Sequence, residues 1–136
     1  MANPVHEIKN PRITIVELPE LTIEGAKYPT IVQAGDVLYV NYFIEKNKIT
    51  RLEQRRLING AFTPPTLMSA SENLMVNWAD RPRFALGHDD SSLVTWLESN
   101  GHGYGIKYMF SRESGAAYTE AKWLHQDQEG AEHGFV

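Results

Sequence analysis

The chain has 136 residues, a formal net charge of −4 and no cysteine. That length fits one domain with a self-sufficient core. The lack of cysteine excludes disulfides, thiolate zinc sites and a cysteine nucleophile. The acidic balance argues against a general nucleic-acid binder. The first residues carry charges and two prolines where a secretory signal needs an apolar stretch, so we expect no signal peptide, no transmembrane segment and a virion or cytoplasmic location.

The N-terminus is predicted to be an extended arm over residues 1–11. Pro4 and Pro11 cannot donate backbone hydrogen bonds and restrict their neighbours, so the arm either lies on the body or reaches a partner. Strands are expected near 12–18 and 21–24, where β-branched residues are frequent.

The longest apolar run, Val37–Ile44, predicts a central strand. Alternate side chains of a strand point to opposite faces, so Tyr39 and Phe43 should face one side and Val40 and Tyr42 the other. Because both sets are apolar or aromatic, we expect a covering layer on each face.

The stretch Ile13 to Tyr28 contains Glu17-Leu18-Pro19-Glu20 and then Gly25. It resembles the opening strand of the GyrI-like effector-binding family. The resemblance implies a module that binds small, often cationic, molecules, with aromatic residues and a carboxylate such as Glu98 around a pocket. Where that family continues with a helix, this chain has a proline, β-branched residues and a glycine.

The segment Ile49–Ile58 fits two structures. As a helix it would align Ile49, Leu52 and Arg56, and as a returning strand its apolar residues alternate with charged neighbours. We favour the strand, because a short polar turn connects the segment to the preceding strand.

Residues 45–58 hold five basic and two acidic side chains, a local excess of +3. Such a face can simply be solvated, or it can contact phosphate or an acidic protein. Arg51, Arg55 and Arg56 are therefore candidate partner contacts. Any contact with nucleic acid would be made through this segment.

The stretch Ala61–Ser69 is predicted to be a loop that exposes apolar groups beside Pro64 and Pro65. Such a loop can pack on its own body or dock into a neighbour. A short helix is expected over 71–79, because serines can cap it and apolar residues then recur at helical spacing.

A second helix is predicted over 91–100. Asp89, Asp90 and Ser91 stand where a helix needs N-terminal acceptors, and Asn100-Gly101 is typical of a helix end. Further strands are expected at 83–86 and 104–110, and the stretch 117–126 fits either a strand or a helix.

These elements predict a single α+β domain over residues 12–125, with a mainly antiparallel sheet and two or three short helices. Residues 126–136 form an acidic tail with two apolar residues, Phe135 among them, at its tip. By composition this tail would be disordered unless it is held by a partner.

The densest titratable cluster is His88-Asp89-Asp90. It could supply a general base or a hard-metal site, which makes a small hydrolase or metal enzyme one alternative. Helix capping explains the aspartates more simply. We therefore predict no catalytic residue, no metal and no cofactor, and lean against an enzyme.

The preferred function is a non-enzymatic assembly or interaction subunit, of a kind found among phage structural proteins. Residues 113–136 hold one basic and five acidic side chains, so they oppose the basic segment 45–58 in sign. Complementary patches on one chain allow head-to-tail contacts between copies or with neighbouring subunits. We expect Pro64, Pro65 and Phe135 to take part, together with the arginines of 45–58.

Overall fold

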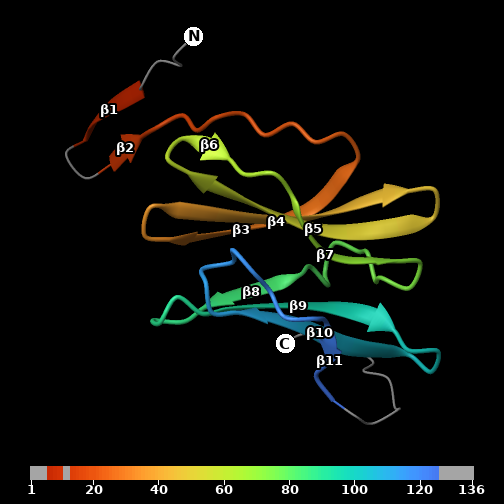
Figure 1. Ribbon diagram of the computed structural model, residues 1–136. Coiled ribbons are helices and arrows are strands. Elements are labelled where there is room, and N and C mark those ends of the chain that lie inside the picture. Colours follow the sequence, from red (N-terminus) through yellow and green to blue (C-terminus); the bar gives the residue numbers. More distant parts are fainter. Residues whose placement is uncertain (1–5, 11–12, 126–136) are drawn as a thin grey trace.

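The computed structural model describes residues 6–10 and 13–125 of the chain (Figure 1). Within these ranges there are eleven strands and no helix, so the predicted α+β fold with short helices is wrong and the fold is all-β. The strands are β1 (His6–Asn10), β2 (Ile13–Ile15), β3 (Ala26–Ala34), β4 (Val37–Lys46), β5 (Ile49–Ile58), β6 (Ala61–Phe62), β7 (Thr66–Ser71), β8 (Arg83–Leu86), β9 (Ser92–Ser99), β10 (Tyr104–Ser111) and β11 (Lys122–Trp123).

Two larger antiparallel sheets pack face to face (Figure 1). The first has the order β3-β4-β5-β6, with β7 also paired to β5, and the second has the order β11-β10-β9-β8. Strands that pair are close neighbours in the chain, so both sheets are up-and-down meanders. The strands β1 and β2 pair with each other as a separate hairpin, at the upper left of Figure 1.

The prediction of a central strand over Val37–Ile44 is confirmed. Strand β4 pairs with β3 on one side and β5 on the other. Tyr39 and Phe43 face the second sheet, where the Tyr39 ring lies 4.7 Å from the ring of Phe84. The alternate residues line the outer face of the sheet: Leu38, Val40 and Tyr42.

The favoured interpretation of Ile49–Ile58 as a strand is also confirmed. Strand β5 pairs with β4 from Lys46↔Ile49 to Leu38↔Leu57. The connecting residues Asn47 and Lys48 both have positive φ angles, 53° and 66°. Two consecutive residues of this kind form the turn whose twist matches that of a β-hairpin.

The predicted loop at Ala61–Ser69 is instead an interrupted edge strand. Strands β6 and β7 pair with successive parts of β5, and the exposed Pro64 and Pro65 separate them. Neither proline has an N–H to donate, so the ladder breaks there and resumes at Thr66.

The predicted helix over 91–100 is strand β9, which lies between β8 and β10. Leu93, Val94 and Thr95 begin a run whose side chains are buried or half-buried on both faces of the sheet. A strand that is buried on both faces has apolar residues at successive positions. The same pattern is found in a buried helix, so periodicity alone does not separate the two. The supposed caps belong to the two hairpin turns that flank β9.

The predicted helix over 71–79 is wrong for a related reason. Leu74 forms an isolated antiparallel bridge with Glu98, so the chain passes beside β9 in an extended form. The Asn77 side chain accepts hydrogen bonds from the backbone N–H groups of Ala79 and Asp80, both at 2.8 Å. This local turn supplies the acceptors that a helix start would otherwise need.

The hydrophobic core lies between the two sheets. Its buried members come from both of them and from the crossing segment: Phe43, Leu52, Met68, Leu74, Val94 and Trp96. The core therefore holds the two sheets together. The opposite face of the first sheet points away from this core and is called the outer face below.

Strand prediction near the N-terminus was only partly correct. Of the predicted strand 12–18, residue 12 lies outside the described residues, and within 13–18 only Ile13–Ile15 forms a strand; 21–24 has no regular structure. Strand β3 was missed, because Pro29 interrupts its pattern and the pairing register shifts between Lys27 and Thr30.

Among the described residues, no helix could cross a membrane. The acidic tail 126–136, with Phe135, lies outside the described residues.

Candidate functional site

The outer face of the first sheet carries an open apolar groove of about 540 Å³. Its floor consists of side chains from β3, β4 and β6: Leu38, Val40, Tyr42, Ile31 and Phe62. Residues 18–23 cross this face without regular structure and form the wall of the groove (Figure 1). The apolar side chains on both faces of β4 predict a covering layer on each face. On the outer face, residues 18–23 supply only part of that layer.

Several side chains around the groove remain exposed to solvent. Ile31 is 63 % exposed and Leu18 is 52 % exposed. Ile15 and Val16, which precede Leu18, are exposed as well. Contiguous exposed apolar side chains on a protein surface commonly mark a site that binds another protein or a ligand.

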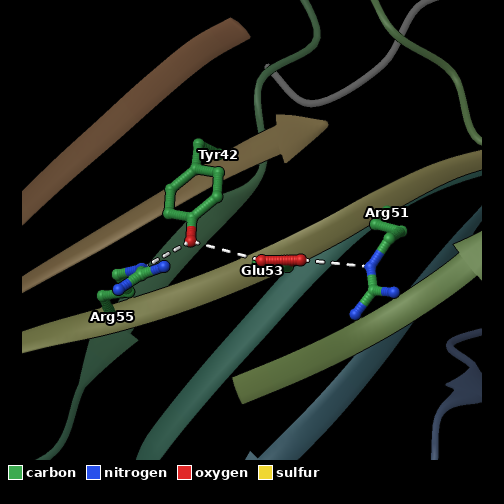
Figure 2. Close-up of polar contacts among 4 residues, drawn as sticks. All are labelled: Tyr42, Arg51, Glu53 and Arg55. Carbon is green, nitrogen blue, oxygen red and sulfur yellow. Dashed lines mark hydrogen bonds and ion pairs between the residues drawn. The ribbon is translucent and has the colours of Figure 1, made fainter. Parts of the chain in front are cut away.

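A polar cluster centred on the buried Tyr42 and Glu53 lies beside the apolar floor, with the exposed Arg51 and the half-buried Arg55 around it (Figure 2). The Tyr42 hydroxyl donates a hydrogen bond to Glu53 Oε1 at 3.4 Å and accepts one from Arg55 Nε at 3.0 Å. Arg51 Nε lies 3.1 Å from Glu53 Oε2 on the other side of the carboxylate. The four side chains belong to one surface, because they occupy alternate positions on the adjacent strands β4 and β5.

The cluster carries one negative and two positive charges. Glu53 is buried, and its carboxylate is matched by Arg51 and by the Tyr42 hydroxyl. Burial raises the pKa of Tyr42 above its ordinary value, and the nearby Glu53 charge adds to the rise while Arg55 opposes it. Tyr42 therefore stays a neutral phenol at neutral pH, and the cluster keeps an excess charge of about +1.

Arg55 is a neighbour of the groove in the sheet but is not one of its lining residues. It stands directly opposite Val40 in the β4–β5 register, and Val40 lines the groove. Among the described residues its guanidinium makes one hydrogen bond, from Nε to the Tyr42 hydroxyl.

The structure does not gather the predicted arginines into one patch. Arg51 and Arg55 lie on the outer face, whereas Arg56 lies on the inner face, where its Nη1 donates to the Ser114 carbonyl at 3.3 Å. The alternation of β5 separates them. Pro64 and Pro65 are exposed at the edge of β5, and Phe135 lies outside the described residues.

The cluster at His88 and Asp89 forms a tight turn between β8 and β9. Asp89 accepts hydrogen bonds from the backbone N–H and the hydroxyl of Ser91. The Ser91 hydroxyl, above all, lowers the pKa of Asp89 below its ordinary value. All three turn residues 88–90 are exposed, and the described ranges contain no group of three metal-ligating side chains. We therefore assign His88, Asp89 and Asp90 to the turn between β8 and β9 and not to a catalytic or metal site.

A second polar network lies on the inner face, between the sheets. Gln54 donates to Asn41 Oδ1 at 2.9 Å and accepts from the Tyr118 hydroxyl at 2.8 Å. The Tyr39 hydroxyl donates to the Ser114 carbonyl at 2.9 Å. These contacts tie the loop after β10 to the first sheet, so we assign the network to the fold.

Sequence reasoning did not single out Tyr42 and Glu53. One feature of the sequence could have indicated them: Glu53 is a charged residue in a predicted strand that pairs with the most apolar run of the chain. A charged residue opposite such a run needs a partner if the face is buried.

Comparison of the chain with protein-family models, curated proteins and solved structures finds no match in any of the three.

Proposed function

We propose that the protein is a non-enzymatic assembly or interaction subunit, and that a second copy covers the outer face of its first sheet. One observation carries the proposal: Ile31 and Leu18 keep more than half of their surface exposed beside an apolar floor. Transfer of such surface from water into a contact is favourable by about 25 cal/mol per Å².

The way the two sheets pack supports this choice of partner. Within the molecule, one meander covers the inner face of the other, and an apolar cluster lies between them. In all-β proteins built from repeated meanders, such as β-propellers, each sheet packs against a neighbour on both faces. The outer face of the first sheet is apolar enough to accept the same kind of neighbour.

The N-terminal hairpin gives further support. In Figure 1 the pair β1 and β2 lies to one side of both large sheets. Ile15, the last residue of β2, and the following Val16 are exposed. An arm in this position is suited to contacts with a neighbouring subunit. Contacts of Pro64, Pro65 and Phe135 with a partner stay predictions, as do a phage origin and the choice between virion and cytoplasm.

Sedimentation equilibrium over a range of protein concentrations tests the proposal. Leu18→Ser should weaken self-association by about fivefold, since it removes roughly 1 kcal/mol of apolar burial. Leu124→Ser is a matched control, because Leu124 is similarly exposed, at 56 %, but lies beyond the edge strand of the other sheet. The two variants should fold equally well, as expected for surface substitutions.

The response to salt separates an apolar contact from a charged one. If the outer face drives association, added sodium chloride should leave it unchanged or strengthen it. If the opposed charges of 45–58 and 113–136 drive it, salt should weaken it. A protein that stays monomeric at high concentration, at every salt concentration and without a co-purifying partner, would contradict the proposal.

A further inference from the structure

We propose that the contact between copies is made head to tail: Trp78 of one copy inserts into the apolar groove on the outer face of the next copy. The inference rests on the proposed self-association, and it names the segment of the second copy that occupies the groove. Such a contact joins two different surfaces of the same chain, so it builds open chains or closed rings instead of a two-fold dimer.

Trp78 belongs to an ordered turn that leaves its side chain in solvent. The residue is 74 % exposed. The Asn77 side chain accepts hydrogen bonds from two backbone N–H groups of the turn, both at 2.8 Å, and Arg81 Nε donates to the Trp78 carbonyl at 3.1 Å. Residues 77–81, called the Trp78 turn below, therefore present the indole on a fixed backbone. Exposed tryptophans of this kind are frequent among the residues that dominate protein–protein contacts.

The Trp78 turn and the groove lie on opposite sides of the first sheet. The turn is part of the connection between β7 and β8, which passes from the first sheet to the second and places Leu74 in the core between them. In Figure 1 this connection lies on the inner side of the first sheet, whereas residues 18–23 cross the outer side. Trp78 is not one of the lining residues of the groove. Its indole therefore reaches a groove only in another copy.

The groove matches an indole in size and polarity. Its volume of about 540 Å³ is in the range of sites that enclose small molecules, about 300–1,000 Å³, so it has room for one indole. Among the described residues that line the groove, none is charged. A buried indole N–H needs an acceptor. The hydroxyl of Thr22, a lining residue, donates to Glu20 at 2.8 Å and keeps lone pairs that can accept from the indole.

The charges beside the two surfaces are opposite in sign. Residues 17–24, which include the wall of the groove, hold three glutamates and no basic residue. The exposed Arg81 and Arg83 follow Trp78, with Asp80 as the one acidic residue of this stretch. Opposite charges around an apolar contact orient the approach of two molecules. Because exposed ion pairs add little affinity, the indole carries the contact, and the response to salt stays that of an apolar one.

Sedimentation velocity on two complementary variants tests the head-to-tail contact. Trp78→Ala removes the indole and keeps the groove, whereas Leu18→Arg places a charge in the groove and keeps the indole. Loss of a buried interface tryptophan weakens association by about thirtyfold or more, so Trp78→Ala should be monomeric near the dissociation constant of the natural protein, as should Leu18→Arg. Mixed in equal amounts, the two should form a heterodimer and nothing larger, because that complex keeps neither an unoccupied intact groove nor an unused indole.

Leu124→Ala is the control, because Leu124 is 56 % exposed and belongs to neither surface, and it should associate like the natural protein. Circular dichroism checks the fold of each variant. If Trp78→Ala associates normally while Leu18→Arg does not, the inference is overturned and the proposed function stands. Two monomeric variants that do not combine would also overturn the head-to-tail contact. If the natural protein does not associate, the proposed function fails and the inference fails with it.

Tryptophan fluorescence of the natural protein tests the contact without any variant. Trp96 is already fully buried and Trp123 lies at the edge of the second sheet, so Trp78 is the indole that loses water when copies associate through the groove. As the protein concentration rises through the dissociation constant, emission should shift to shorter wavelength and quenching by acrylamide should decrease. Association that leaves both unchanged would overturn the inference.

Discussion

Tyr42→Phe tests the polar cluster most directly, because it removes one oxygen and keeps the ring that lines the groove. The hydroxyl bridges Arg55 Nε at 3.0 Å and Glu53 Oε1 at 3.4 Å. A hydrogen bond to a charged group contributes about 1.5–3 kcal/mol, and the longer contact adds little. The substitution also leaves the buried Glu53 with Arg51 alone. We therefore expect a loss of about 1.5–3 kcal/mol in the free energy of unfolding at pH 8.

The same variant should change the dependence of stability on pH. Burial raises the pKa of Tyr42 in the folded protein, whereas an unfolded chain loses the phenolic proton near pH 10. Above about pH 10 the phenol therefore ionises more readily in the unfolded state, so the free energy of unfolding falls as pH rises through the folded pKa, by up to about 1.4 kcal/mol per pH unit for one group. Tyr42→Phe removes this contribution, so its stability should fall less steeply.

Urea unfolding followed by circular dichroism, at several pH values between 8 and about 11, measures both effects. Tyr104→Phe is the control, because Tyr104 is 38 % exposed, and it should change stability by less than about 0.5 kcal/mol. If Tyr42→Phe matches Tyr104→Phe at pH 8 and keeps the full alkaline slope, the hydroxyl does not link Arg55 to Glu53.

Three further predictions concern the core, a turn and metal binding. Trp96→Phe should cost about 2–4 kcal/mol in urea unfolding, because Trp96 is fully buried and its Nε1 donates to Glu98 Oε2 at 3.2 Å; an unchanged stability would contradict the assigned core. Gly115→Ala should cost at least about 1 kcal/mol more than Gly60→Ala. Both glycines have φ near +78°, at +77° and +79°, but only at 115 would a Cβ lie 3.0 Å from the Tyr118 hydroxyl; equal costs would contradict this packing. Finally, EDTA or added zinc should leave the melting temperature unchanged, and a clear shift would reveal a metal site beyond the described residues.

The candidate site was harder to predict than the strands around it. Arg51 and Arg55 were selected for their charge, and the structure places both in the outer cluster. Arg56 was selected for the same reason but faces the inner network. Charge counted along the chain ignores the two faces of a strand, so it merged residues that the sheet separates.

Helix and strand were confused where the chain is buried on both sides. The segment 91–100 has apolar residues at helical spacing and polar residues at each end, and both features also suit a buried strand between two hairpin turns. The choice depends on β8 and β10, which supply the backbone partners of β9. A single segment carries no information about those partners.

The sequence by itself predicted the strands β4, β8 and β10 and favoured a strand over a helix at β5, because alternation or apolar runs and flanking turns are local features. It also determined that β4 must be covered on both faces. The tertiary structure decided what covers them: a second sheet on the inner face and only a partial wall on the outer one. Burial is a property of the assembled layers, so the groove arises only when residues 18–23 pack across the sheet.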